Sequence, residues 1–259
     1  GLITKKHELL TANHAIIDAL AGAVSEIQAA GMSPIIVHGA GSFGHIKARK
    51  WRLHEGRIEG WVDDTTSDDS ITTQDDACQS VHNDMLQLNG YVVDSLTRVG
   101  LATSVHPPRD WASGTGPEFS GIFHDFLDIS DRTIPILFGD VVNCPNNDFG
   151  ILSGDDIVLR LALKLDAVSA VVFCLGGADG MLTAPPDVSD SELMDTWSTD
   201  MDLHGRHDSD IDVTGGIALK AARAGSICEV VDAVWFVNGE YPDRVVKAAL
   251  GGEPMGTRI

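Results

Sequence analysis

Hydrophobic residues recur at helical spacing in several stretches of the chain. Residues 12–28 and 81–99 place apolar side chains three and four positions apart, which predicts two amphipathic helices. Residues 157–165 are apolar nearly all round, so we expect a buried helix there. The glycine-containing segment 212–216 is expected to open a fourth helix that runs through Ala224.

Shorter apolar runs between these helices predict buried strands, and three of them lead into glycines. The runs are 34–38, 134–138, 167–175 and 233–237. A further stretch, 141–152, carries Pro-Asn-Asn-Asp in its middle, which is typical of a hairpin. The acidic and polar residues 59–76, by contrast, predict a surface loop or a flap.

Strands that alternate with helices, with glycine turns after the strands, indicate an α/β fold. We expect a three-layer αβα sandwich with a mostly parallel central sheet. A single domain, residues 1–259, is expected, with two lobes, 1–150 and 151–259, on one continuous sheet. Ligands of such sheets gather at the carboxyl ends of the strands, where the glycine turns lie.

Composition and charge narrow the classes of partner. Acidic residues number 38 and basic residues 18, a net charge of −20 that argues against binding nucleic acid or anionic membranes. No apolar run approaches the roughly 18 residues that span a membrane. The four cysteines form no C-x-x-C pair, which argues against a disulfide or metal framework and favours a reducing cytoplasm. The Asp-rich, Lys-poor composition suits a high-salt habitat, and an ordinary acidic protein fits it equally.

The first candidate site is VHGAGSFGH, residues 37–45. Glycines after a strand let backbone N–H groups approach a phosphate, and the start of the next helix adds positive potential. The segment is not a P-loop, since no Lys-Ser or Lys-Thr follows, and it is not a convincing G-x-G-x-x-G turn. His45 could donate to a phosphate oxygen. A plain strand-to-helix turn with an ordinary histidine fits these residues as well.

Four further segments could bind anions, and each also has a plain structural interpretation. SGDD at 153–156 could be an N-cap, GGADG at 176–180 a loop, and Lys5-Lys6 an isolated dipeptide. DVTGGIALK at 212–220 places Lys220 one turn inside a glycine-rich helix start, although a solvated lysine is the alternative. Together, glycine turns, two or three lysines, a histidine and an aspartate are what phosphoryl transfer requires.

Four segments, in their order, resemble those of the amino acid kinase superfamily. VHGAGSFGH, FGDVV, GILSGDDI and DVTGGIALK are most similar to the segments of isopentenyl phosphate kinases within it. VHNDM at 81–85 and the terminal GTRI also look related. The resemblance spans nearly the whole chain. It implies the amino acid kinase fold, with 1–150 as the phosphate-acceptor lobe and 151–259 as the ATP-binding lobe.

The resemblance implies that the chain moves the γ-phosphoryl group of ATP onto isopentenyl phosphate, in isoprenoid biosynthesis by the alternate mevalonate pathway. ATP and Mg²⁺ are the implied cofactors, with the metal ligands left open, and a cytoplasmic homodimer is the implied assembly. The implied site residues are Lys6, His45, Asp155 and Lys220 for catalysis, Ala40, His45 and Gly154 for the acceptor, and Gly1, Gly41, Asp179, Gly180, Gly216 and Lys220 for ATP.

Individual roles come from the same resemblance. His45 would donate to the acceptor phosphate, Lys6 would stabilise the transferring phosphoryl group, and Lys220 would reach the ATP phosphates. Asp155 would orient the lysines, as a carboxylate flanked by cations can. Part of an apolar pocket for a five-carbon tail is expected from the helix that contains Val81, His82 and Met85.

The chain departs from the family pattern at three places. The K-x-G-G of the first strand is absent apart from Gly1, so one catalytic lysine is expected outside this numbering or not at all. Ala40 stands where the family usually has glycine, which is tolerable only if its φ is negative. Gly176-Gly177 replaces a Thr-Asp pair, so the usual base-side contacts to ATP are in question.

Two other functions stay open. A kinase of this fold could act on another small phosphate or phosphonate, as fosfomycin-type kinases do, and the pocket beyond His45 would decide between acceptors. The second alternative is a non-catalytic nucleotide-binding or storage protein, against which the presence of Lys6 and Lys220 argues.

Overall fold

The computed structural model describes residues 2–5, 7–61, 71–122, 132–184, 188, 190–201 and 216–259. Its helices are α1 (His14–Ala29), α2 (Gly41–Lys50), the 3-10 helix η1 (Leu53–Glu55), α3 (Gln74–Arg98), α4 (Pro108–Trp111), α5 (Gly154–Lys164), α6 (Gly216–Ile227) and α7 (Pro242–Ala249). Its strands are β1 (Ile36–His38), β2 (Thr103–Val105), β3 (Ala112–Ser113), β4 (Ser120–Gly121), β5 (Ile134–Phe138), β6 (Asp140–Cys144), β7 (Asp148–Leu152), β8 (Val171–Leu175), β9 (Val234–Asn238) and β10 (Thr257–Arg258). Every helix and strand predicted from the hydrophobic pattern is present, with ends displaced by a few residues.

Helix α3 begins inside the stretch 59–76 that was predicted to be a loop. Thr73 is its N-cap: the Thr73 hydroxyl accepts a hydrogen bond from the backbone N–H of Asp76 at 3.1 Å, and the Asp76 carboxylate accepts one from the backbone N–H of Thr73 at 3.0 Å. This capping box stabilises a polar first turn, so the helix extends beyond its apolar repeat. The loop prediction was wrong at this end, and residues 62–70 lie outside the described residues.

Among the described residues, strand pairing forms three sheets. In the first, β1 and β2 both run parallel to the central strand β5. In the second, β8 runs parallel to β9, and the short β10 pairs antiparallel with the other edge of β9. The third contains the predicted hairpin, in which β6 and β7 pair antiparallel. The first two sheets confirm the mostly parallel character that the sequence predicted.

The expectation of one continuous sheet was wrong for the described residues. Of the strands that the structure describes, β1 pairs with β5 alone and β8 with β9 alone. In the described part of the chain, a cavity and no strand lies between the other edges of β1 and β8, so hydrogen bonding does not run from one sheet to the next. Helices that contact both sheets hold them together.

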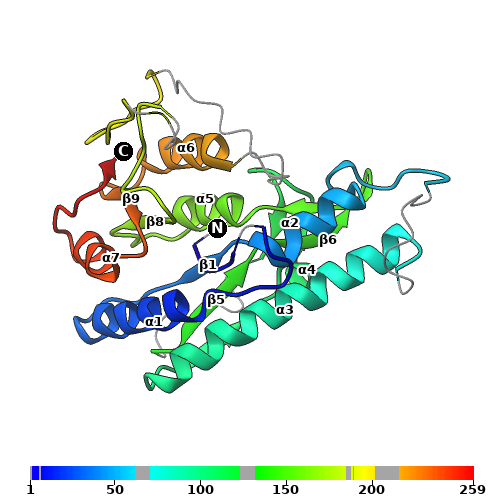
Figure 1. Cartoon of the computed structure of the whole chain (residues 1–259), viewed down its shortest axis with the longest axis horizontal. Helices are drawn as coiled ribbons and strands as arrows, with labels where there is room; N and C mark the ends of the chain where they lie inside the picture. Colours follow the sequence, from blue (N-terminus) through cyan, green and yellow to red (C-terminus); the bar gives the residue numbers. More distant parts are fainter. Residues whose placement is uncertain are drawn as a thin grey trace.

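These helices form layers on both faces of the sheets (Figure 1). On the first sheet, α1 and α3 pack on one face around Ile136, and α5 packs on the other around Leu137. On the second sheet, α1 and α7 pack around Val237, and α5 and α6 pack around Phe236. Because α1 and α5 each contact both sheets, the two sheets share one set of layers. The predicted three-layer αβα architecture is confirmed.

Two further features bear on the protein's surroundings. Among the described residues, no helix has the length and apolar character needed to cross a membrane. The four cysteines, Cys78, Cys144, Cys174 and Cys228, are free thiols. Burial raises the pKa of Cys174 to about 11, so this thiol beside the cavity stays protonated at neutral pH.

Candidate functional site

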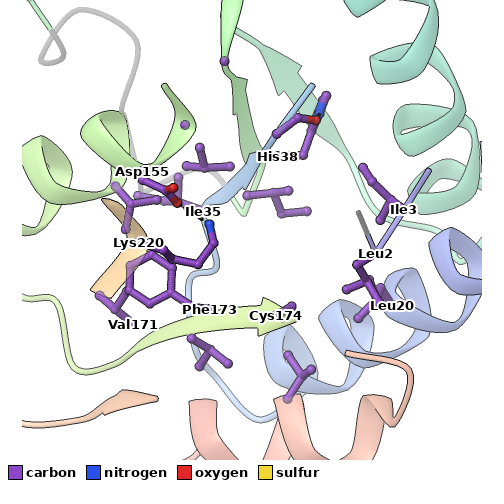
Figure 2. A pocket seen from close by; sticks show the side chains of 18 of the residues that line it. Leu2, Ile3, Leu20, Ile35, His38, Asp155, Val171, Phe173, Cys174 and Lys220 are labelled. Atoms are coloured by element: carbon purple, nitrogen blue, oxygen red, sulfur yellow. Dashed lines mark hydrogen bonds and ion pairs between the residues drawn. The ribbon is translucent and has the colours of Figure 1, made fainter. Parts of the chain in front are cut away.

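A cavity of about 1170 Å³ lies between β1 and β8 and reaches the carboxyl ends of both strands. Between the two sheets its walls are apolar, with side chains such as Leu20, Ile35 and Val171 (Figure 2). At the strand ends the walls are polar and rich in glycine, and they include Asp155 and Lys220. This strand-end part combines glycine turns with a lysine and an aspartate, so the candidate site lies there.

The turn that follows β1 depends on a glycine. Gly41 has a φ of +48°, in the left-handed region that favours glycine. A Cβ atom at Gly41 would lie 1.9 Å from Oγ1 of Thr4, which is far too close. The same hydroxyl oxygen accepts a hydrogen bond from the backbone N–H of Ser42 at 3.2 Å. Thr4 therefore packs against the turn, holds it by this hydrogen bond, and leaves no room for a side chain at Gly41.

Ala40, the departure from the family pattern in this turn, adopts an ordinary backbone conformation. Its φ is −75° and its ψ is −34°, so the condition set for an alanine at this position is met. A Cβ atom at Gly44 would lie 2.6 Å from the Cβ of Ala40. The alanine is thus accommodated because a glycine follows one helical turn later. Ala40, Gly41, Gly44 and His45 all line the cavity.

Two more glycine turns converge on this edge. The backbone N–H of Gly139, after β5, donates to the carbonyl oxygen of His38 at 3.1 Å. A Cβ atom on Gly139 would lie 3.2 Å from the backbone nitrogen of Gly154, the first residue of α5. A Cβ atom on Gly154 would lie 3.4 Å from the same His38 carbonyl oxygen. Three turns that are distant in sequence therefore pack backbone against backbone at the cavity edge.

Lys220 and Asp155, both predicted site residues, are in contact where α5 and α6 border the cavity. Nζ of Lys220, on α6, donates to Oδ1 of Asp155, on α5, at 2.5 Å (Figure 2). The Lys220 ammonium also lies 5.5 Å from the ring centroid of Phe173 on β8. Ser153 caps α5 by accepting from the backbone N–H of Asp155 at 3.2 Å. The N-cap interpretation therefore holds for Ser153, while the Asp155 carboxylate holds Lys220.

A second ion pair, which was not predicted from the sequence, joins the same two helices. Nε of Arg223 donates to Oδ1 of Asp156 at 2.6 Å. Asp156 is buried, and burial raises the pKa of its carboxyl above the ordinary value in spite of the arginine. The available signal was the spacing of Lys220 and Arg223, three residues apart on one helix, opposite two consecutive aspartates.

Besides Gly41 and Lys220, two more residues expected to bind ATP line the cavity. Gly216 is the first residue of α6 and has a φ of +55°. Gly180 lies against the C-terminal strand, where a Cβ atom would come within 2.5 Å of Oγ1 of Thr257. That hydroxyl accepts from the backbone N–H of Met181 at 2.8 Å. The terminal GTRI segment thus helps to fix the loop after β8.

Other expected site residues lie elsewhere or outside the described residues. Asp179 does not line the cavity but pairs with Arg244 of α7 at 2.6 Å, and this contact holds the pKa of the Asp179 carboxyl below its usual value. Lys5 pairs with Glu8 at 3.3 Å on the surface. Gly1 and Lys6 lie outside the described residues, as do residues 212–215.

An apolar wall stands beside His45. Val81 and Met85, both from α3, line the cavity together with His45 from α2, as the resemblance implied. His82, the third residue expected on this wall, is not part of the lining. A ligand with its phosphate at His45 would therefore meet apolar side chains of α3.

His38, at the end of β1, is a buried histidine at this edge that the sequence analysis did not single out. Its ring stacks on Phe138 with 5.2 Å between centroids, and its Nε2 lies 3.3 Å from Oδ1 of Asn89. Burial lowers the pKa of His38, so the ring is neutral at pH 7. The signal that could have found it is a histidine at the end of an apolar strand, directly before a glycine turn.

Comparison with known proteins agrees with this geometry. The sequence profile of the amino acid kinase family matches residues 4–236. Isopentenyl phosphate kinase from Methanothermobacter thermautotrophicus is 28% identical over 251 residues, which cover 93% of this chain and 90% of that protein. The enzyme of that name from Haloferax volcanii is 32% identical over 179 residues, or 65% of this chain and 69% of that protein. A product complex of Thermoplasma acidophilum isopentenyl phosphate kinase superposes with a TM-score of 0.76 at 25% identity, covering 100% of this chain and 95% of that one. Since the profile match spans most of the sequence, the chain belongs to the amino acid kinase family.

Proposed function

We propose that the chain transfers the γ-phosphoryl group of Mg-ATP to isopentenyl phosphate and releases isopentenyl diphosphate and ADP. The observation that carries this proposal is the meeting of three glycine turns, the Lys220–Asp155 pair and His45 beside an apolar wall. Such a site offers donors and a cation to phosphates and apolar surface to a short hydrocarbon. The curated relatives and the solved structure described above carry the same activity in their names.

The proposed reaction depends on alignment of the two phosphate groups and not on covalent catalysis by the protein. An oxygen of the acceptor phosphate attacks the γ-phosphorus, the bond from this phosphorus to the bridging oxygen breaks, and ADP leaves with the electron pair. Because the attacking oxygen is already anionic, no general base is required. The protein's part is to hold two anions in line and to neutralise their charge.

The acceptor phosphate is proposed to lie at the turn of Ala40 and beside Gly154, with His45 donating to one of its oxygens. The start of α2 brings the positive end of its helix dipole to this place. A hydrogen bond to a charged group contributes about 1.5–3 kcal/mol. The hydrocarbon would extend along Val81 and Met85, away from the charged edge.

Lys220 is the proposed cation for the transferred group. In the structure it is already held by Asp155, so it needs no large movement to face a phosphate at the cavity edge. Asp155 is accordingly a positioning residue for Lys220. Lys6 is proposed as a second cation, and the placement of Thr4 directly over Gly41 brings the chain that leads to Lys6 to the same edge.

The nucleotide is proposed to contact Gly41, Gly180, Gly216 and Lys220, with Asp179 and Gly1 as further contacts from the family resemblance. Among the described residues, no cluster of three or more His, Cys, Asp and Glu side chains could hold a metal ion. We propose that Mg²⁺ binds together with ATP, whose phosphates supply ligands with water.

The wider setting is also a proposal. Isopentenyl diphosphate is the five-carbon building block of isoprenoids, so the reaction would belong to isoprenoid biosynthesis. We propose that residues 1–150 hold the acceptor and residues 151–259 hold ATP, in a cytoplasmic homodimer. The free thiols of all four cysteines are compatible with a reducing compartment.

The test is ADP release by the purified chain with Mg-ATP, measured with isopentenyl phosphate, with fosfomycin and without acceptor. Rapid release with isopentenyl phosphate alone is the expected result. Faster ADP release with fosfomycin would mean that the chain is a kinase with a different acceptor from the one proposed. ATP binding without release in any of the three reactions would favour a nucleotide-binding protein without catalytic activity.

A further inference from the structure

A fully enclosed carboxylate lies at the edge of the cavity where the acceptor phosphate is proposed to bind. Asp140, the first residue of β6, lines the cavity, and its side chain is 0% exposed. It directly follows Gly139, whose backbone packs against Gly154. A buried negative charge in a site for an anion is unfavourable unless donors compensate it. The residues that do so therefore bear on acceptor binding.

The structure gives Asp140 two donors within the described residues. Its Oδ1 accepts from the backbone N–H of Val141 at 2.7 Å. Its Oδ2 lies 2.6 Å from Nδ1 of His82, which comes from α3 and is 13% exposed. The other donor belongs to the backbone, so His82 is the side chain that supplies a hydrogen bond to Asp140.

Besides the His82–Asp140 contact at β6, helix α3 makes a second polar contact, to the end of β1. Asn89, seven residues after His82, lies two helical turns further along α3 and contacts His38 at 3.3 Å. His38 ends β1 and Asp140 follows β5, and these two strands are register partners at His38 and Phe138. The helix is thus attached at two points to the strand ends that carry the glycine turns, and its residues Val81 and Met85 line the cavity near the first of these points.

We propose that His82 is a positioning residue for the phosphate acceptor. By donating to Asp140, it compensates the buried carboxylate at the anion site and holds the apolar wall of α3 at a fixed distance from the Gly139 turn. Loss of His82 leaves the buried carboxylate without its side-chain donor beside the acceptor phosphate, which weakens acceptor binding. This inference rests on the proposed function, because it requires an anionic acceptor at this edge.

The test is a double-mutant cycle on steady-state kinetics. His82→Ala is expected to raise KM for isopentenyl phosphate by about 10-fold, which corresponds to about 1.4 kcal/mol, while KM for ATP stays nearly constant. Adding Asp140→Asn to this variant is expected to recover most of the loss, because the uncompensated charge is removed. His82→Gln, which keeps a donor, is expected to lie between wild type and His82→Ala.

A matched control is available on the same helix. Asp84 pairs with Lys47 at 2.5 Å and joins α3 to α2, with side chains as buried as that of His82. Neither residue lines the cavity. Asp84→Asn is expected to lower the melting temperature and to leave KM for isopentenyl phosphate unchanged. An equal rise of KM in this control would mean that any disturbance of α3 has the same effect, and it would overturn the proposal.

The remaining outcomes separate this inference from the proposed function. An unchanged KM in folded His82→Ala, or no recovery in the double variant, overturns the role of His82 alone. If His82→Ala does not fold, Asp140→Asn replaces it: this variant is expected to bind the acceptor at least as tightly as wild type, and weaker binding overturns the proposal. If wild type does not turn over isopentenyl phosphate, the proposed function fails. Protection against thermal unfolding by inorganic phosphate then tests His82, and equal protection of wild type and His82→Ala overturns the inference.

Discussion

The acceptor edge and the nucleotide edge of the cavity meet negative charge in different ways. The acceptor edge is built from backbone: a Cβ atom on Gly41 would overlap Thr4, one on Gly139 would be tight against neighbouring backbone, and one on Gly154 would already touch its neighbours. The nucleotide edge is built from charged side chains that are already paired, Lys220 with Asp155 and, behind them, Arg223 with Asp156. Backbone donors have a fixed geometry and no net charge, whereas the paired lysine has charge and must share it with a ligand.

This difference suits a reaction in which one phosphate is held still and another is transferred. Changes at the acceptor edge should act mainly on stability and on acceptor KM. Changes at the nucleotide edge should act mainly on the rate, because charge develops on the transferred group. The following substitutions test this division.

The largest effect is expected from Lys220→Met. Removal of a preorganised cation from the transition state lowers kcat by about 10²–10³-fold. The substitution also leaves the mostly buried Asp155 carboxylate without its cation, so the unfolding free energy is expected to fall, and kcat is compared at a temperature where both variants are folded. Lys247→Met, at an exposed position on α7 outside the cavity lining, is the control for loss of one positive charge. A kcat for Lys220→Met close to that of the control would remove the lysine from the mechanism.

Gly41→Ala should act on the fold instead. An alanine at a φ of +48° is strained, and its Cβ overlaps Oγ1 of Thr4. We expect a loss of more than about 2 kcal/mol in unfolding free energy by denaturant titration. Gly100→Ala is the matched control, since its φ is +83° but nothing lies within 4 Å of the new Cβ. Equal losses in the two variants would show that Thr4 does not constrain the turn.

His45→Ala is expected to raise KM for the acceptor by about 10- to 100-fold, because a hydrogen bond to a charged oxygen is lost. KM for ATP should stay within a small factor of wild type. His54→Ala removes a histidine from the exposed surface of η1, just beyond α2, and serves as the control. Normal acceptor kinetics in His45→Ala would leave the acceptor edge without its expected side-chain donor.

The smallest effect concerns the buried His38 and is visible only as a pH dependence. Because burial lowers the pKa of folded His38 below the ordinary 6.5, the unfolded chain binds this proton more readily. The free energy of unfolding therefore falls as the pH drops below about 6.5, by at most about 1.4 kcal/mol per pH unit for one proton, and is regained above it.

His38→Gln should flatten this dependence. The measurement is denaturant unfolding between about pH 5.5 and 7.5, with His54→Gln as the exposed control. His106, whose pKa burial also lowers, accounts for part of the remaining slope. A slope identical to that of wild type would contradict a buried neutral His38.

Much of the fold could be predicted because its elements are governed by local patterns. The apolar runs at β1, β5, β8 and β9, and the helical repeats of α1 and α3, needed no tertiary information. The early start of α3 was missed because its first turn is polar and depends on the Thr73 capping box. The short strands β2, β3 and β4 were missed because two or three residues carry no period.

In the candidate site too, some contacts could be predicted from the sequence and others could not. Lys220 and Asp155 could be predicted to meet through the family resemblance, and their 2.5 Å contact agrees with that prediction. The pair of His82 with Asp140 joins segments far apart in sequence and follows no local motif. For Arg223 and Asp156, the spacing of the charged residues was the one signal, and it does not specify that the two segments meet. Such contacts depend on how α3 and α6 pack against other elements, which sequence periodicity does not specify.

The measurement that tests the central claim most directly is ³¹P NMR of the reaction of the purified chain with Mg-ATP and isopentenyl phosphate. The account predicts that the single acceptor resonance is replaced by two mutually coupled resonances of a diphosphate, while ATP is converted to ADP. Release of inorganic phosphate with an unchanged acceptor resonance would contradict phosphoryl transfer to this acceptor.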